Sequence, residues 1–181
     1  MTGSVRSKLE GYQEALHQNG LTVRQEYICS CSLDIQESAA EVERLAEAGL
    51  KFDGVIATED SIAVGVLKYA QRHGIAVPDD LCVIGFGNTN LTESCTPELS
   101  SVDNSVEAAC VAAVSMLIHK LKNHRIPSEL TVSSAVVYRK TTREEDALPI
   151  IVGMALQPIS HCIHCNFGRP VRRTAISTGR D

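Results

Sequence analysis

The sequence predicts an α/β fold, with a parallel sheet covered by helices on both faces. Two compact apolar runs, "DGVIAT" (53–58) and "LCVIGF" (81–86), are typical of strands that are buried on both sides. Around these runs, apolar residues recur at the three- and four-residue spacing of helices. Strands that alternate with helices along a chain indicate a parallel sheet with helical layers on both faces.

The first two helices are predicted from capping residues, apolar stripes and glycine stop signals. Ser4 can cap a helix that runs to about Asn19 and ends before Gly20. The apolar stripe of this helix is Leu9, Tyr12 and Leu16. A short strand is expected at 26–30, and a second helix then ends at Gly49. The apolar residues of the second helix are Ile35, Ala39, Val42 and Ala46.

Two more helices and a last strand are expected further along the chain. Asp60 or Ser61 can cap a helix that ends at Gly74, after the strand at 53–58. Its inward residues are Ala63, Val66, Leu67 and Ala70. Ser105 opens a long helix, after the strand at 81–86, with Val106, Cys110, Ala113, Leu117 and Leu121 aligned. The run "TVSSAVVY" (131–138) is predicted to be the final strand.

Composition is that of an ordinary soluble globular protein. The 181 residues, 44% of them hydrophobic and 22% charged, are enough for one or two domains with a real core. No apolar run approaches a membrane span and no apolar signal stretch follows Met1, so we expect a cytoplasmic protein without a membrane partner. The net charge of −5 gives no general reason to bind nucleic acid. Most of the seven cysteines are expected to be reduced and buried.

The chain changes character near residue 143. Residues 143–146 are a charge cluster, an apolar run follows at 147–153, and the chain then continues into a cysteine- and histidine-containing patch and a basic end. We therefore expect residues 1–142 to be ordered and residues 143–181 to be an irregular or disordered tail. The patch "HCIHC" offers four possible metal ligands, namely His161, Cys162, His164 and Cys165. Their spacing is too tight for a standard zinc finger, so no structural metal and no cofactor are expected.

Two loops are the candidate functional positions of the predicted sheet. Ligands of open parallel sheets bind beyond the carboxyl ends of the strands, which here are the loops Thr58–Ser61 and Gly87–Asn90. A dinucleotide fingerprint needs a third glycine where Asn90 stands, and there is no phosphate-binding P-loop pattern. No catalytic set is found, including the G-x-S-x-G elbow, so the chain is not expected to be an enzyme. The alternative is purely structural: carboxylates that start a helix at 59–60, and a glycine that only serves a turn.

Three motifs make the chain similar to a known family. The pattern G-x-x-V-P-D-D-x-x-V-I-G-F at 74–86 is followed by P-x-L-S-S-V at 97–102 and by V-x-R-x-T-T at 137–142. Residues 3–142 resemble the regulatory core of the lactose-repressor/galactose-repressor (LacI/GalR) family of bacterial transcription regulators. The piece "GFGNTNLTE" is particularly similar to the catabolite-control branch of that family.

The resemblance implies a periplasmic-binding-protein-like core of two lobes, with a small effector held between them. Residues 1–104 would be the C-terminal lobe, 105–125 a crossover helix toward the first lobe, and 126–142 a returning strand. The first lobe and the helix-turn-helix domain of the family lie outside the matched segment. DNA binding is therefore expected only through an N-terminal domain that this chain lacks, and residues 1–142 are expected to be marginally stable.

The resemblance also implies an effector site and a dimer surface. The effector, of the sugar or sugar-phosphate class, would contact the following residues: Lys8, Leu33, Glu59, Asp60, Gly87, Asn88 and Asn104. Gly87 stands where the family typically has an aspartate, and Lys8 where arginine is common, which argues against a simple neutral sugar. The subunit-pairing surface would include Ala39, Val64, Leu91 and Cys95.

Three functions agree with these expectations. The first is the ligand-sensing and dimerisation portion of a transcriptional regulator, acting as a homodimer or paired with a full-length regulator. The second is a free-standing sugar-binding receptor lobe. The third is a truncated reading frame without a function.

Overall fold

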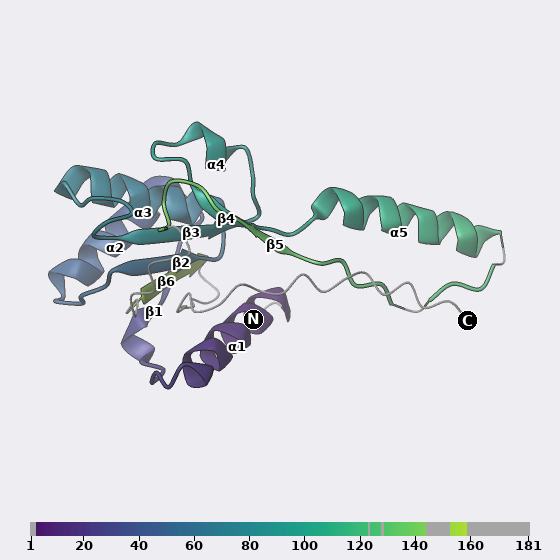
Figure 1. The fold of residues 1–181 in the computed structure, drawn as a ribbon, viewed down its shortest axis with the longest axis horizontal. Helices are drawn as coiled ribbons and strands as arrows, with labels where there is room; N and C mark the ends of the chain where they lie inside the picture. Colours follow the sequence, from purple (N-terminus) through teal and green to yellow (C-terminus); the bar gives the residue numbers. More distant parts are fainter. Residues whose placement is uncertain (1–2, 123, 128, 144–152, 159–181) are drawn as a thin grey trace.

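The computed structural model describes residues 3–122, 124–127, 129–143 and 153–158. They form an α/β lobe built on one six-stranded sheet in the order β1-β6-β2-β3-β4-β5 (Figure 1). The strands are β1 (Ile28–Cys31), β2 (Gly54–Ala57), β3 (Cys82–Phe86), β4 (Ser100–Asp103), β5 (Ala135–Val137) and β6 (Gly153–Pro158). All neighbouring pairs are parallel except β4 and β5, so the predicted parallel sheet is confirmed apart from one antiparallel edge strand.

Helices cover both faces of the sheet, as the sequence predicts. The helices are α1 (Gly3–Gln18), α2 (Ile35–Glu47), α3 (Asp60–His73), the short α4 (Leu91–Ser94) and α5 (Val106–Leu121), and a 3-10 turn (Gln25–Tyr27) precedes β1. Helices α2 and α3 lie on one side of the sheet and α1 lies on the other (Figure 1). None of the helices in the described residues is long and apolar enough to cross a membrane.

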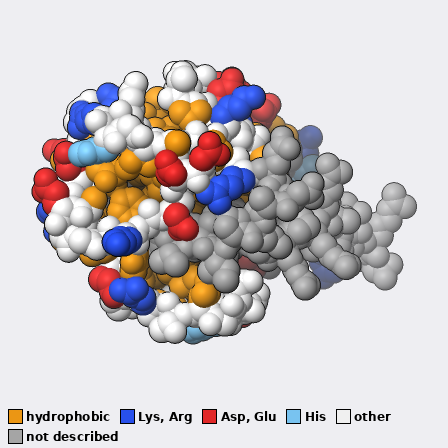
Figure 2. Space-filling model, turned by 60° about the vertical axis from the view of Figure 1, so that its left-hand side comes forward, with side chains coloured by type: hydrophobic (Ala, Val, Ile, Leu, Met, Phe, Trp, Pro, Cys, Tyr) orange, Lys and Arg blue, Asp and Glu red, His pale blue; other side chains and the backbone are white. Residues whose placement is uncertain are grey.

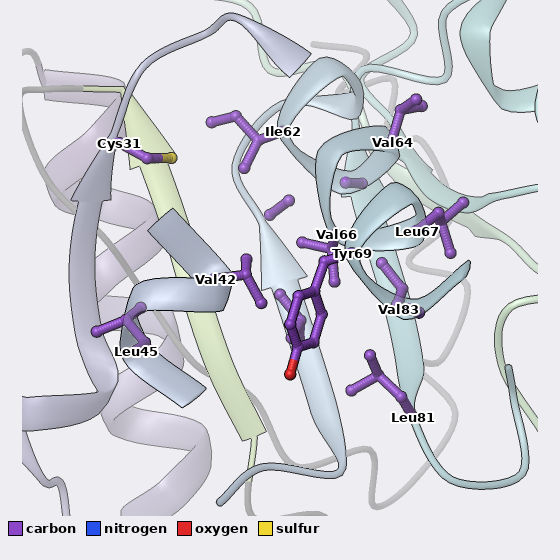
Figure 3. Close-up of a cluster of buried hydrophobic side chains, with 14 of the residues drawn as sticks. Cys31, Val42, Leu45, Ile62, Val64, Val66, Leu67, Tyr69, Leu81 and Val83 are labelled. Atoms are coloured by element: carbon purple, nitrogen blue, oxygen red, sulfur yellow. The ribbon is translucent and has the colours of Figure 1, made fainter. Parts of the chain in front are cut away.

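The main core lies between the sheet and the α2–α3 layer. Figure 3 shows Val42 of α2 and Val66 and Tyr69 of α3 pointing into this layer, and all three are buried. A smaller cluster around Tyr12 and Leu16 fixes α1 to the other face. The apolar stripes therefore bury the faces that their helical spacing predicts.

Helices α2 and α3 approach each other closely because one of them carries a glycine. A Cβ at Gly65 would lie 2.6 Å from the Cβ of Ser38, so only glycine fits at the crossing. Ala39 is 0% exposed beside this crossing and is part of the interior of the lobe.

Helix α5 projects away from the rest of the lobe (Figure 1). None of its side chains is buried in the described structure, although it is the most apolar of the described helices. Leu117 is 56% exposed and Leu121 is 75% exposed. Ser105 opens this helix as predicted, but its hydroxyl donates to the carbonyl of Ser133 instead of capping the helix.

Two sequence-based expectations need correction. The strand expected at 131–138 is shorter, because β5 covers only Ala135–Val137. The tail after residue 143 was expected to be irregular, yet residues 153–158 form β6 between β1 and β2. The physical reason is that an apolar run suits a position flanked by strands on both sides.

Charges of both signs are interspersed on the face shown in Figure 2. On this face Lys and Arg side chains alternate with Asp and Glu side chains, and apolar atoms lie between them. A nucleic-acid surface requires basic side chains gathered on one face, and this view shows no such gathering.

Candidate functional site

The predicted effector residues gather at one edge of the sheet, beyond the carboxyl ends of its parallel strands. Leu33 follows β1, Glu59 and Asp60 follow β2, Gly87 and Asn88 follow β3, and Asn104 follows β4. Parallel strands all end at the same edge, so these positions converge although they are far apart in the sequence. Leu33 is 52% exposed and Asn104 is half-buried.

Lys8 of α1 reaches this edge from the other side of the sheet. Its ammonium nitrogen donates to the Thr58 carbonyl (3.0 Å) and lies 3.8 Å from the ring centroid of Phe86. Burial lowers the pKa of Lys8, although the carboxylates of Glu59 and Asp60 act in the opposite direction. Lys8 is therefore a packed cation at the ends of β2 and β3, not a solvated helix residue.

Glu59 lies beside Lys8 and is the more accessible member of the pair. The ammonium nitrogen and the Glu59 Oε1 are 3.9 Å apart, and the Glu59 side chain is 47% exposed against 17% for Lys8. Burial raises the pKa of Glu59, and the neighbouring Lys8 lowers it. Because the Glu59 side chain is 47% exposed, its carboxylate stays open to a ligand.

Asp60 is buried and its carboxylate is used inside the protein. Its Oδ2 accepts hydrogen bonds from the backbone N–H (2.7 Å) and the hydroxyl (2.9 Å) of Thr89, and its Oδ1 accepts one from the Ser101 hydroxyl (2.6 Å). A Cβ at Gly85 would overlap Asp60 Oδ1, so the strand carries glycine at that point. The geometry makes Asp60 a residue that positions the loop after β3, which differs from the direct effector contact that was expected.

The loop after β3 has a fixed backbone shape. Gly87 has φ +122° and donates its N–H to the Val102 carbonyl (2.8 Å), whereas Asn88 has φ 48° and donates its N–H to the Ser101 hydroxyl (3.0 Å). Positive φ values suit glycine and asparagine better than other residues. The backbone of Gly87 therefore suits the turn, and its predicted contact with an effector stays a prediction.

Arg139 holds the Asn88 side chain, and sequence reasoning missed this residue. Its guanidinium donates to the Asn88 Oδ1 (2.9 Å) and to the Leu99 carbonyl (2.9 Å), and it lies 3.5 Å from Glu93. Its side chain is only 12% exposed. The motif V-x-R-x-T-T was recognised as a family pattern, but nothing in the linear sequence places its arginine under a loop 51 residues away.

A pocket of about 550 Å³ adjoins this loop. It lies between the ends of β3 and β4 and the first turns of α5, and its lining residues are Gly87, Asn88, Asp103, Ser105, Val106, Glu107, Ala108 and Val111. Small-molecule sites usually have volumes of about 300–1,000 Å³. Gly87 and Asn88 were predicted here, whereas the two carboxylates, Asp103 and Glu107, were not.

A second groove of about 240 Å³ contains three of the four predicted dimer residues. Val64, Leu91 and Cys95 line it together with other residues of α3, of α4 and of the segment after α4. Ala39 does not belong to this surface, because it is fully buried at the α2–α3 crossing.

No group of three or more possible metal ligands is found in the described residues. The four weak candidates in "HCIHC", His161, Cys162, His164 and Cys165, lie outside the described residues.

Comparisons with known proteins agree with the fold of the lobe. Residues 3–142 match the family of periplasmic binding protein-like domains. The chain is 34% identical over 135 residues to a helix-turn-helix-type transcriptional regulator of Lachnoclostridium phytofermentans, covering 75% of this chain and 40% of the relative. It is 31% identical over 137 residues to catabolite control protein A of Priestia megaterium, covering 75% of this chain and 41% of the relative.

One similar solved structure is a sugar-binding transcriptional regulator of the LacI family from Escherichia coli, complexed with phosphate. The two share 29% sequence identity with a TM-score of 0.71, covering 77% of this chain and 50% of that one. The chain thus spans less than half the length of the two relatives above.

Proposed function

Because this chain belongs to the LacI/GalR family of regulators with a periplasmic binding protein-like core, we propose that residues 3–142 sense a small polar effector. The effector lies against the edge formed by the carboxyl ends of β2, β3 and β4. The observation that carries the proposal is the 550 Å³ pocket beside Asn88, with Lys8 and Glu59 at the same edge of the sheet.

The chemistry of the pocket favours a ligand with several hydroxyl groups. Asp103 and Glu107 line it. Asp103 already accepts hydrogen bonds from the Ser105 N–H (2.7 Å) and the Asn88 side-chain amide (3.4 Å), and the remaining lone pairs of the two carboxylates can accept hydrogen bonds from hydroxyl groups. A phosphate placed between these carboxylates would be repelled, so a sugar fits this pocket better than a sugar phosphate. This proposal departs from the expectation, based on Gly87 and Lys8, that a simple neutral sugar is disfavoured. Sugar binding and a bound phosphate are both named for the Escherichia coli structure, so both ligand classes belong in the experiment.

Helix α5 supports a two-lobed arrangement. Its exposed apolar residues, which include Val111, Leu117 and Leu121, form a surface that soluble proteins normally cover. We propose that this helix packs on the first lobe of the regulator core. The effector then lies between two walls, and its differential affinity for the open and closed arrangements changes their populations.

The groove between α3 and α4 is the proposed subunit contact. Val64, Leu91 and Cys95 line one continuous groove, which gives a second copy an apolar surface to pack on. In this proposal DNA is contacted through another domain of the regulator, and the lobe supplies sensing and pairing.

An NMR titration of the chain tests the position of the site. One wall offers two or three hydrogen bonds of about 0.5–1.5 kcal/mol each, while association costs at least about 4 kcal/mol, so the dissociation constant is expected to be millimolar or weaker. At tens of millimolar sugar, amide shifts should change at Glu59, Asn88 and Asn104 and stay constant in the α3–α4 groove. Shifts confined to the groove, or no shifts with any of a panel of sugars and sugar phosphates, would disprove the assignment.

A further inference from the structure

Strand β6 holds two parts of the sheet together. It pairs with β1 through four residues, from Ile28↔Ala155 to Cys31↔Pro158. It pairs with β2 through four residues on its other side, from Gly54↔Gly153 to Ala57↔Leu156. Among the described strands β1 has no other neighbour, so β1 is joined to the sheet only through β6.

The position of β6 in the sheet does not follow its position in the sequence. Helix α2 connects β1 to β2, and these parallel strands leave one strand position between them. If the position between β1 and β2 is counted as strand 1, then β1, β2, β3 and β4 are strands 2, 3, 4 and 5. The sheet then has the doubly wound order 2-1-3-4-5. This order gives the position to a strand that leads into α1, yet here it is filled by the last of the described strands.

We propose that the space between β1 and β2 is a binding site for a parallel strand, and that β6 of the same chain fills there the position that the doubly wound order gives to a strand before α1. The segment suits the position. It lies in the run "LPIIVGMALQP" (148–158), which is mostly apolar, as strands with neighbours on both sides are. Pro158 has no N–H to donate and is the last residue of β6, so it interrupts no ladder within the strand.

The geometry favours the chain's own segment over that of a second copy. The Thr141 carbonyl accepts the N–H of Val83 at the start of β3, and Gly153 stands opposite Gly54 at the start of β2. Strands are about 4.8 Å apart, so the start of β6 lies roughly 10–15 Å from Thr141. Residues 142–152 can span up to about 36 Å when extended, which is ample for this connection.

A disulfide scan of the full chain tests the proposal. The Cα partner of Leu156 in β1 is Cys29, so oxidised Leu156→Cys should link Cys29 to the introduced thiol in a monomer-sized product. Gln157→Cys is the matched control, because its partner is Ser30 and the side chains of successive strand residues point to opposite faces. The bond is identified by non-reducing electrophoresis and peptide mass mapping.

Three results of the scan would overturn the proposal. The first is that Cys29 forms no bond with the introduced thiol of Leu156→Cys. The second is that this bond forms only in a dimer-sized product. The third is that Cys29 is linked equally well in the Gln157→Cys control. The dimer-sized product would show that a second copy supplies the strand.

Hydrogen exchange of the full chain gives an independent readout. Ala155→Pro removes a backbone N–H from the middle of β6, so the amides of Ile28–Cys31 should exchange at least ~10-fold faster. Ala155→Val keeps the N–H and should preserve their protection. Unchanged exchange in β1 of the proline variant would contradict the proposal; if this variant unfolds throughout, the disulfide scan decides.

Discussion

Removing the Asp60 carboxylate should loosen the loop after β3 and destabilise the lobe. Asp60 is 2% exposed, and its carboxylate accepts three hydrogen bonds, two from Thr89 and one from Ser101. In Asp60→Ala all three donors lose their acceptor at once. The hydroxyl groups can turn toward other acceptors, but the Thr89 N–H has a fixed direction.

The size of the effect follows from the three bonds. A hydrogen bond to a charged group contributes about 1.5–3 kcal/mol, and such bonds are not additive when their donors can find other partners. We therefore expect Asp60→Ala to lower the free energy of unfolding by about 3–5 kcal/mol. For a chain of this size that corresponds to a fall in Tm of roughly 6–20 °C.

Urea unfolding followed by circular dichroism measures this change. Asp79→Ala is the matched control, because it removes the same charge from an exposed position and should cost less than about 0.5 kcal/mol. Asp60→Asn should lie between the two, since its amide retains one acceptor oxygen for three donors. If Asp60→Ala and Asp79→Ala unfold at the same urea concentration, Asp60 does not anchor the loop and the account of the site is wrong.

Three further predictions concern single residues. Gly85→Ala should lower Tm, because the added Cβ would overlap the buried carboxylate of Asp60. Gly11→Ala should raise the stability by up to ~1 kcal/mol, because Gly11 lies in a helix with open space around it. Equal shifts of Tm in the two variants would contradict this prediction. Burial lowers the pKa of Lys8 in the folded chain, so between that lowered pKa and about 10.5 the unfolded chain binds more protons than the folded chain. The free energy of unfolding should therefore rise with pH across this window. Urea titrations at several pH values should show a smaller slope for Lys8→Gln. Burial raises the pKa of Cys31 to about 12, so iodoacetamide at pH 8 should modify the exposed Cys110 long before Cys31, as read by peptide mass mapping; equal rates would contradict the burial of Cys31.

The regular elements could be predicted because their signals are local. Gly20, Gly49 and Gly74 were expected to end helices, and all three have positive φ in the structure. The run at 81–86 was predicted as a strand and forms β3 from Cys82. Such signals depend on a few neighbouring residues, so contacts between distant segments do not alter them.

The part of the site that could not be predicted depends on contacts between distant segments. Thr141 illustrates this, because its hydroxyl donates to the Val83 carbonyl (2.6 Å) and accepts the Ser100 N–H (2.8 Å). Asp60 looked like a ligand contact since it follows a strand, and only the positions of Thr89 and Ser101 show that its carboxylate is occupied. Hydrogen bonds that span 29 to 58 residues leave no periodic pattern in a sequence.

Strand β6 was missed for a different reason. Residues 147–153 form an apolar run, but a strand is expected to pair near its neighbours in the chain. Strand β6 instead pairs with β2, 99 residues earlier (Gly54↔Gly153), and with β1, 127 residues earlier (Ile28↔Ala155). Its place becomes apparent only from the order of the sheet, which has one strand position between β1 and β2.

The central claim is that the carboxyl edge of this sheet forms one wall of an effector site. It is tested most directly by calorimetric titration of a chimera, in which residues 3–142 replace the matching segment of catabolite control protein A of Priestia megaterium. We expect the chimera to bind at least one member of a sugar and sugar-phosphate panel, and Lys8→Ala and Glu59→Ala each to weaken binding at least ~10-fold, or about 1.4 kcal/mol. The exposed α2 residue Glu47 serves as control, and Glu47→Ala should leave the affinity unchanged. A folded chimera that binds no ligand, or whose affinity is the same in all three variants, would contradict the claim.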